Sequence, residues 1–299
     1  MNNLDYELIL CNKNLSTELI EKMKGLKIDR EIVDRRVAIY KEKNVVVKYI
    51  NKYDTYPSKN AEFKIVEDII TDKFTNPHLI DIHAMIKFNY TKKITKILLK
   101  KDISPHTNKK RKVEEEDHDN FGIIMPKYET LSEYLQKNKD IDQKLLLSNI
   151  LGLLDLCIDI RDTYNFYHKD IKVDNILIKD DIFYLIDWEF VIEKGNIYFA
   201  NERPEQGNTE MYPFFNATGE QFLIHSIGVL ITRIIGYNYN VTFDDFMQNY
   251  AIEYILSNIP KEKIELYEDL IIKIFDKKYH RIEKLKDDIS ILLDKVNNG

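Results

Sequence analysis

The sequence predicts an α+β chain of two lobes, and the order of its periodicities is the main reason. Residues 1–125 combine β-branched stretches with one helical pattern, whereas residues 126–299 mostly carry apolar positions at helical spacing. Strands followed by a run of helices are typical of α+β proteins. The length of 299 residues lies near the upper limit of what one hydrophobic core organises. We therefore expect a small, β-rich lobe over 1–125 and a larger, helical lobe over 126–299.

The composition is that of a soluble globular protein, with 44% apolar and 31% charged residues. The net charge of −6 argues against a basic face, so no direct nucleic-acid binding is expected. No apolar run approaches the roughly 20 residues that span a bilayer, so no membrane partner is expected either. Two cysteines make a disulfide framework improbable. These features predict an intracellular protein.

The small lobe is expected to begin with a helix-prone segment over residues 1–30, because cap-type Ser16 and Thr17 precede apolar positions at helical spacing. Residues 35–50 predict a hairpin, since β-branched residues flank a polar turn. A helix is predicted over 60–74. Short strands are predicted over 79–88, 94–99 and 121–125. In the larger lobe the same spacing predicts helices over 130–137, 141–164, 219–236, 243–256 and 260–275.

The segment 101–120 holds a basic block followed by an acidic block, which predicts an exposed loop inserted in the small lobe. Within it, Lys109-Lys110-Arg111-Lys112-Val113 matches a nuclear-localisation signal. One interpretation is therefore nuclear import through a receptor that binds this block. The other is a solvated charge run, balanced by its acidic neighbours, in a cytoplasmic protein.

The most informative stretch covers residues 167–190. Its spacing, H-x-D-x-K-x-x-N followed by an apolar run and a second Asp, suits phosphoryl transfer from ATP. That reaction needs one carboxylate to orient the acceptor hydroxyl, an amide and a second carboxylate to hold Mg²⁺, and a cation near the transferred group. The alternative interpretation is two short strands joined by a polar turn. The residues concerned are His168, Asp170, Lys172 and Asn175 in the loop 167–178, and Asp187 in the segment 187–189.

This stretch resembles the catalytic loop and metal-binding segment of protein kinases, and the resemblance can be followed across most of the chain. Lys48 after three valines resembles the family's strand lysine, and Glu62 resembles the helix glutamate that pairs with it. Glu67 is the rival partner. Phe121–Glu129 resembles the hinge between the lobes, so the backbone at Met125 and Lys127 would pair with adenine. The resemblance implies a bilobal protein-kinase-like fold.

The resemblance also implies a role for each residue. Asp170 would orient the acceptor hydroxyl, and Lys172 would contact the γ-phosphoryl group. Asn175 and Asp187 would bind Mg²⁺, and Lys48 would contact the α- and β-phosphates. A lysine two residues after the catalytic Asp is the form found in Ser/Thr kinases. The implied activity is transfer of the γ-phosphoryl of ATP to Ser/Thr hydroxyls of protein substrates.

Three departures from the family pattern keep other functions open. The turn at Ile28–Arg36 has no glycine to let backbone amides approach phosphate, which supports a pseudokinase or scaffold as an alternative. Asp187-Trp188-Glu189 stands for Asp-Phe-Gly and is similar to choline- and aminoglycoside-kinase-like enzymes, which supports a small-molecule kinase. Leu223 stands where an aspartate braces the family's catalytic loop.

Overall fold

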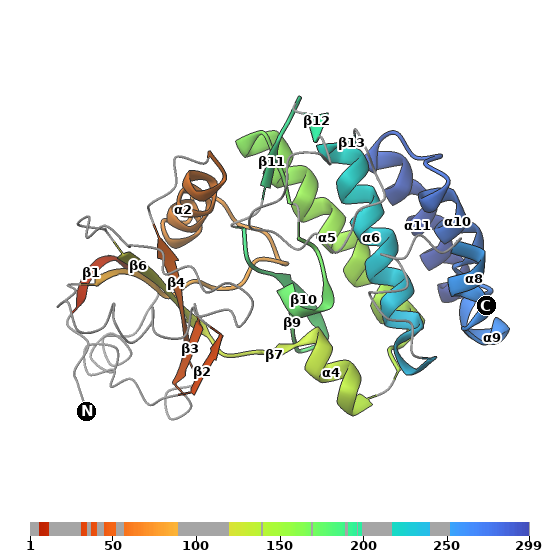
Figure 1. Cartoon of the computed structure of the whole chain (residues 1–299), viewed down its shortest axis with the longest axis horizontal. Helices are drawn as coiled ribbons and strands as arrows, with labels where there is room; N and C mark the ends of the chain where they lie inside the picture. The colour runs from red at the N-terminus through yellow and green to blue at the C-terminus, as the bar shows by residue number, and fades with distance from the viewer. Residues whose placement is uncertain are drawn as a thin grey trace, which may run out of the picture. The chain divides into compact units, whose positions relative to one another are not determined.

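The computed structural model describes residues 6–11, 31–34, 37–40, 45–51, 57–88, 120–138, 140–168, 170–188, 191–195, 197–198, 217–239 and 252–298. The chain is α+β (Figure 1). Its contacts divide it into two compact units. Unit 1 consists of Met1–Thr75 and Ile80–Lys127, and unit 2 of Asn76–Leu79 and Tyr128–Gly299. This division lies close to the predicted boundary at residue 125, but it also assigns Asn76–Leu79 to the second unit.

Unit 1 contains an antiparallel six-stranded sheet in the order β1-β5-β6-β4-β3-β2. The predicted hairpin over 35–50 is confirmed, because β3 and β4 pair from Val37↔Lys48 to Tyr40↔Val45. Three consecutive valines favour this strand, since β-branched side chains pack well on a pleated surface. The strands are β1 (Tyr6–Cys11), β2 (Glu31–Asp34), β3 (Val37–Tyr40), β4 (Val45–Asn51), β5 (Ala84–Phe88) and β6 (Asn120–Pro126).

One prediction for this unit is wrong. Residues 6–11 are strand β1, which pairs with β5, although the sequence predicted a helix-prone segment there. The pairing with a distant strand overrides the weak local preference. Within the range Ile28–Arg36, residues 31–34 form strand β2, which pairs with β3 up to Asp34↔Val37, so the chain reverses direction between Asp34 and Val37. The predicted strand 94–99 and the charged segment 101–119 lie outside the described residues, as do residues 12–30.

Helix α2 (Pro57–Ile70) contains most of the predicted helix 60–74, but it begins and ends earlier. Its buried face consists of Ala61, Ile65, Val66, Ile69 and Ile70, at spacings of one to four residues. Such a stripe faces a core because helical residues three and four apart lie on one side. Phe63 packs edge-to-face against Phe121 of β6, with 5.3 Å between ring centroids, so α2 is fixed to the sheet.

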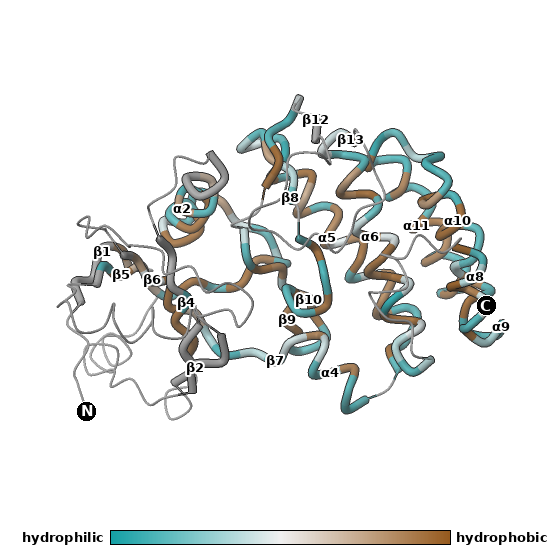
Figure 2. Tube along the Cα trace, viewed as in Figure 1, coloured by the Kyte–Doolittle hydropathy of each residue, from teal (hydrophilic) through white to brown (hydrophobic). Residues whose placement is uncertain are grey.

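Unit 2 is mostly helical. Figure 2 shows hydrophobic and hydrophilic residues alternating along α5, α6, α10 and α11, as expected of helices with one buried side. In this unit α11 packs against α5 and α6, and α10 packs against α6. The helices are α4 (Leu131–Asn138), α5 (Gln143–Tyr164), α6 (Gly219–Ile235), α8 (Ile252–Ser257), α9 (Lys261–Ile264), α10 (Glu268–Phe275) and α11 (Ile282–Asn298).

Helix α11 was not predicted, although Ile282, Leu285 and Ile289 are buried at helical spacing and carried the signal. The predicted helix 260–275 is interrupted, because residues 265–267 separate α9 from α10. Of the predicted helix 243–256, only the part in α8 lies within the described residues.

Side-chain caps explain where the long helices begin. Asp142 accepts a hydrogen bond from the Leu145 backbone N–H at the start of α5. Thr218 and Gln221 form a reciprocal capping box at the start of α6. Such caps satisfy backbone donors that lack a partner within the helix, and each contributes about 1 kcal/mol. At the other end of α5, Asn165 adopts a left-handed φ of 65° and ends the helix.

Short strands flank the loop 167–178 and the segment 187–189, which contain the predicted catalytic and metal-binding residues. The hairpin β9–β10 turns through Asp180 and Asp181, whose φ angles of 50° and 63° are those of a type I′ turn. β9 also pairs with β7, and β8 pairs with β11. The strands are β7 (Glu129–Thr130), β8 (Phe166–His168), β9 (Ile176–Lys179), β10 (Ile182–Leu185), β11 (Val191–Glu193), β12 (Ile197–Tyr198) and β13 (Ala217–Thr218).

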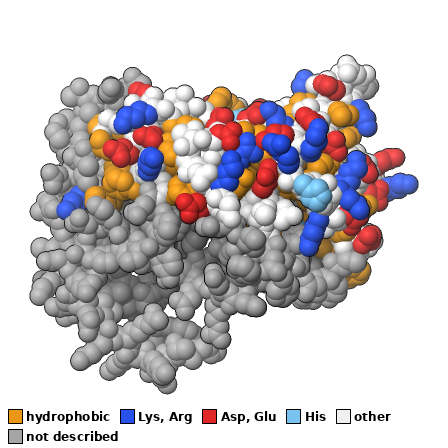
Figure 3. Space-filling model, turned by 90° about the horizontal axis from the view of Figure 1, so that it is seen from above, with side chains coloured by type: hydrophobic (Ala, Val, Ile, Leu, Met, Phe, Trp, Pro, Cys, Tyr) orange, Lys and Arg blue, Asp and Glu red, His pale blue; other side chains and the backbone are white. Residues whose placement is uncertain are grey.

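Two surface properties bear on the predicted partners. Within the described residues, no helix combines the length and apolar character needed to cross a bilayer. The face shown in Figure 3 carries acidic and basic side chains interspersed over the described elements.

The buried histidine of α6 predicts a pH dependence of stability. Burial lowers the pKa of His225 to about 3, and the Lys277 charge acts in the same direction. The unfolded side chain titrates near 6.5. The native state therefore binds fewer protons below pH 6.5, and its free energy of unfolding falls as pH drops toward 3.

We expect His225→Gln to reduce this slope by about 1.4 kcal/mol per pH unit between pH 5.5 and 4. Urea denaturation at several pH values measures it. His280→Gln changes an exposed histidine and serves as the control. Equal slopes in wild type and His225→Gln would contradict this assignment.

Candidate active site

The loop 167–178 begins at the end of β8, forms the 3₁₀ turn η2 (Val173–Asn175) and continues into β9. Two backbone hydrogen bonds fix its second half. Asn175 N donates to Lys172 O at 3.0 Å, and Ile186 N donates to Asn175 O at 3.0 Å. The second bond extends the β9–β10 ladder by one residue beyond the Leu185↔Ile176 pair. The end of the loop and the residue before Asp187 are therefore adjacent.

The carboxylate of Asp170 is buried and held on one side only. Its Oδ2 lies 2.7 Å from Asn175 Nδ2 and 3.0 Å from Lys172 Nζ. Asn175 Nδ2 also donates to the Asp170 carbonyl at 2.8 Å. Asp170 Oδ1 accepts no hydrogen bond from the part of the chain that the structure describes. One oxygen is thus fixed by a cation and an amide, while the other can accept a further donor.

The bonds of Asn175 also decide the orientation of its amide. Both of its partners are oxygens of Asp170, so the NH₂ group must face them and Oδ1 must face away. An amide oxygen and the Asp187 carboxylate are both hard oxygen ligands, which suit Mg²⁺. The described part of the chain contains no group of three His, Cys, Asp or Glu residues that could hold a metal ion. The predicted ligand pair consists of one asparagine and one aspartate, so it is not a group of this kind. Its oxygen atoms nevertheless suit Mg²⁺.

Asp187 itself lies in the left-handed region, with φ of 70°. A non-glycine residue rarely adopts this conformation, although aspartate does so more readily than most. Such conformations cost on the order of 1–3 kcal/mol and persist only where the surrounding structure fixes them. They cluster at functional sites, so the backbone at Asp187 is a feature to be explained.

His168 joins the two segments that carry the acids. Its Nδ1 accepts the Asp170 N–H at 3.0 Å, so Nε2 carries the proton and faces the Ile186 carbonyl at 3.3 Å. The ring is buried and meets Trp188 edge-to-face, with 4.6 Å between centroids. His168 is therefore a packed residue that supports the loop.

Apolar packing supports the loop where the sequence lacks the family's aspartate. Leu223 is fully buried in α6. A Cβ on Gly219, in the first turn of α6, would lie 2.5 Å from the ring of Tyr167 in β8. Because Gly219 has no side chain, α6 approaches β8 closely. The strand that leads into the loop is therefore braced by close contact rather than by a carboxylate.

Unit 1 contains the predicted ion pair. Lys48 Nζ of β4 lies 2.6 Å from Glu62 Oε1 of α2, and both side chains are almost fully buried. Among the described residues, Glu67 makes no ion pair with Lys48, so the favoured partner is the observed one. A buried pair is weak evidence for stability, because desolvation of the two charges offsets their attraction. Its presence calls for another explanation.

The remaining predicted residues, Met125 and Lys127, lie near the end of β6 and directly after it. Met125 pairs with Val46 of β4 and is buried, and Lys127 is the last residue of unit 1. Their pairing with adenine stays a prediction. Lys48, Glu62, Met125 and Lys127 belong to unit 1, whereas Asp170, Lys172, Asn175 and Asp187 belong to unit 2. Lys169, Glu189 and the basic block Lys109–Val113 lie outside the described residues.

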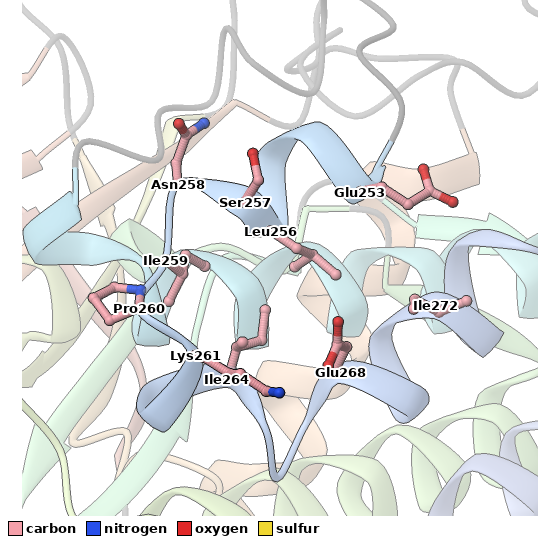
Figure 4. A pocket seen from close by; sticks show the side chains of 10 residues that line it. All are labelled: Glu253, Leu256, Ser257, Asn258, Ile259, Pro260, Lys261, Ile264, Glu268 and Ile272. Carbon is pink, nitrogen blue, oxygen red and sulfur yellow. The ribbon is translucent and has the colours of Figure 1, made fainter.

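A pocket of about 720 Å³ lies elsewhere in unit 2, between α8, α9 and α10 (Figure 4). Leu256, Ile259 and Ile264 give it an apolar lining, and Glu253 and Glu268 add carboxylates. None of the predicted site residues lines it. This pocket is therefore separate from the loop 167–178, whose geometry is given by its hydrogen bonds.

Sequence reasoning missed one group of residues near Asp187. These residues are His78, Asn149 and Gly152. All three contact one another or the backbone of β10. One signal was available. Glycine inside a helix costs about 1 kcal/mol relative to alanine, so Gly152 within an apolar helical run indicates a close neighbour.

The buried ion pair of unit 1 gives a prediction of stability. Glu62→Gln keeps the shape of the side chain but removes the Glu62 carboxylate from the buried Lys48 ammonium. We expect the free energy of unfolding to fall by about 3 kcal/mol. Urea denaturation measures this as a lower midpoint with an unchanged slope.

Glu67→Gln, on the same helix, is the control and should change stability by at most about 0.5 kcal/mol. Replacing both partners, as Lys48→Met with Glu62→Leu, should recover much of the loss. Equal losses in the Glu62 and Glu67 variants would contradict the assignment.

Comparison with known proteins adds no family to this geometry. No protein-family model and no curated protein matches the chain.

Proposed function

We propose that this protein transfers the γ-phosphoryl group of ATP to Ser or Thr hydroxyls of protein substrates, within a bilobal protein-kinase-like fold. The observation that carries the proposal is the half-occupied carboxylate of Asp170. Asn175 and Lys172 hold its Oδ2, and Oδ1 accepts no hydrogen bond within the described residues. A carboxylate fixed in this way can orient a hydroxyl, which is what phosphoryl transfer asks of it.

In this proposal Asp170 Oδ1 receives the hydrogen bond of the acceptor hydroxyl and aligns its oxygen for attack. Holding reactants in a defined geometry contributes much of the rate in such reactions. The two bonds on Oδ2 prevent rotation of the carboxylate, so the position of Oδ1 is set before substrate arrives. Lys172 Nζ, 3.0 Å from Oδ2, also places a positive charge beside the acceptor.

Asn175 and Asp187 would hold Mg²⁺, which neutralises phosphate charge when it is bound with ATP. The contribution of the protein is to orient the two donors. Asn175 Oδ1 points away from Asp170. The backbone hydrogen bond from Ile186 N to Asn175 O joins the two segments of unit 2, and it keeps Asp187, the next residue, close to Asn175.

Lys48 would contact the α- and β-phosphates. This role also explains why a costly buried ion pair is present. Glu62 fixes a flexible lysine side chain in one direction, and an apolar pair of similar volume could not bind phosphate.

The basic block leaves two alternatives for the location of the protein, and the missing glycines leave alternatives for its function. Lys109–Val113 remains a prediction of nuclear import, with a cytoplasmic location as the alternative. A scaffold would show no turnover, and a small-molecule kinase would use a different acceptor. The next experiment therefore distinguishes both interpretations from the proposal.

We expect Asp170→Asn to lower the rate of phosphate transfer by about 10²–10⁴-fold, because an amide orients the hydroxyl poorly and cannot accept its proton. The measurement is transfer of label from γ-labelled ATP to casein and to the protein itself. Asp174→Asn, an exposed acid in the same loop, is the matched control and should retain the wild-type rate.

Transfer that persists in Asp170→Asn would overturn the role of Asp170. No transfer by the wild type would favour a scaffold. Transfer to choline, sugars or aminoglycosides without labelling of protein would favour a small-molecule kinase.

A second prediction concerns the metal. Trp188 is the only tryptophan of the sequence and directly follows Asp187, so its fluorescence reports on this segment. We expect Mg²⁺ added with ATP to change Trp188 emission, and Asp187→Asn to raise the half-saturating Mg²⁺ concentration at least about tenfold. Asp180→Asn, in the exposed hairpin turn, should match the wild type. An unchanged Mg²⁺ dependence in Asp187→Asn would exclude Asp187 as a ligand.

A further inference from the structure

Strand β10, which leads to Asp187, needs partners on its outer edge. Its inner edge pairs with β9, and β10 is the last strand of its sheet. Backbone groups on such an edge are satisfied by water, by side chains or by another segment. The way in which they are satisfied determines how firmly the following residues are placed.

Two residues from distant parts of the chain supply these partners. Asn149 Oδ1 of α5 accepts the Phe183 N–H at 2.8 Å. His78 Nδ1 lies 2.8 Å from the Phe183 carbonyl, and the His78 carbonyl accepts the Leu185 N–H at 3.1 Å. A carbonyl can only accept, so Nδ1 of His78 carries the proton. Together with the Leu79↔Leu185 bridge, His78 acts as a short parallel strand beside β10.

The imidazole of His78 is seated on α5 above Gly152. A Cβ built on Gly152 would lie 1.7 Å from Nε2 and 2.4 Å from Cδ2 of the ring. No side chain other than hydrogen is compatible with this position of the ring. Asn149 and Gly152 are three residues apart and share one face of α5, so this face supports β10 directly and through His78.

The backbone around His78 is fixed as well. Asn76 Oδ1 accepts the His78 N–H at 2.9 Å, and Asn76 Nδ2 donates to Asp159 Oδ2 at 2.9 Å. Asp159 lies two turns of α5 beyond Gly152. Side chain, N–H and carbonyl of His78 therefore each have a defined partner.

These contacts end two residues before the unusual backbone of Asp187. His78 fixes the Leu185 N–H, and His168 Nε2 faces the Ile186 carbonyl. A left-handed aspartate persists only where its neighbours determine it. The two histidines supply that constraint on the residues immediately before Asp187.

We propose that His78, seated on Gly152, is a positioning residue that fixes the backbone of Leu185–Asp187 and so sets the place of the Asp187 carboxylate. Its consequence for Mg²⁺ rests on the proposed function, whereas its consequence for the backbone does not. His78 itself contacts no reacting atom in this account.

The first test is a double-mutant cycle read by urea denaturation. Gly152→Ala should lower the unfolding midpoint in the wild type, because the methyl group displaces the imidazole. In a His78→Ala background the same change should raise the midpoint, since alanine favours the helix once the ring is gone. The same direction of shift in both backgrounds would overturn the seating of His78 on Gly152.

The second test asks whether the seating positions Asp187. Amide hydrogen exchange at Leu185 and Ile186 should speed up in His78→Ala and Gly152→Ala, under conditions where each variant is folded. His78→Asn keeps an N–H donor at the δ position and should restore part of the protection. His280→Ala, an exposed histidine, should exchange as the wild type does. Unchanged exchange in folded His78→Ala would overturn the proposal.

The third test uses Trp188 emission during titration with Mg²⁺ in the presence of ATP. We expect the half-saturating Mg²⁺ concentration to rise about tenfold or more in His78→Ala and to return toward the wild type in His78→Asn. A role limited to stability would leave this concentration unchanged in folded protein, and that result would overturn the link to Asp187. If the wild type shows no response to Mg²⁺, the proposed metal site fails, and hydrogen exchange alone decides the role of His78.

Discussion

The amide of Asn175 is the interaction on which the candidate site depends. Its NH₂ group bonds both the carbonyl and the carboxylate of Asp170, and this single orientation has two effects. It leaves one oxygen of Asp170 available, and it turns the amide oxygen toward the side where a cation could be bound. Either effect alone would be unremarkable in a polar turn. Their combination in one short loop is the basis of the proposed role of Asp170 in orienting an acceptor hydroxyl.

The polar groups of both units share a property that stability does not explain. The Lys48–Glu62 pair and the Asp170 cluster place charges in buried positions, where apolar residues of similar volume would fold at least as well. Each charge is nevertheless held by a specific partner, from another element in the Lys48–Glu62 pair and from the same loop around Asp170. Such arrangements are retained where the position of a charge matters more than the energy of the fold. The proposed phosphoryl transfer requires charges held in this way.

The sequence predicted the parts of the structure that depend on local pattern and on one strong motif. The hairpin of β3 and β4, helix α5, and the pairing of Lys48 with Glu62 follow from β-branched runs, helical spacing and the resemblance. It failed where distant partners decide, as in β1, which is a strand because β5 is beside it. The left-handed Asp187 and the contact of His78 with Gly152 could not be predicted, because both arise only when segments far apart in sequence meet. Helix α11 was predictable from its apolar spacing and was overlooked.

The segment Asn76–Leu79 has a consequence for how the chain can be divided. It belongs to unit 2 by its contacts, yet the stretches on either side of it belong to unit 1. A fragment excised at Tyr128 would keep every long helix of unit 2 but lose the piece that covers β10. The carbonyl of Phe183 and the N–H of Leu185 would then face solvent beside the strand that ends at the second acid. A segment of unit 2 thus lies between the two parts of unit 1 in the sequence. Cutting the chain at Tyr128 would remove this segment from unit 2 and expose the strand that leads to Asp187.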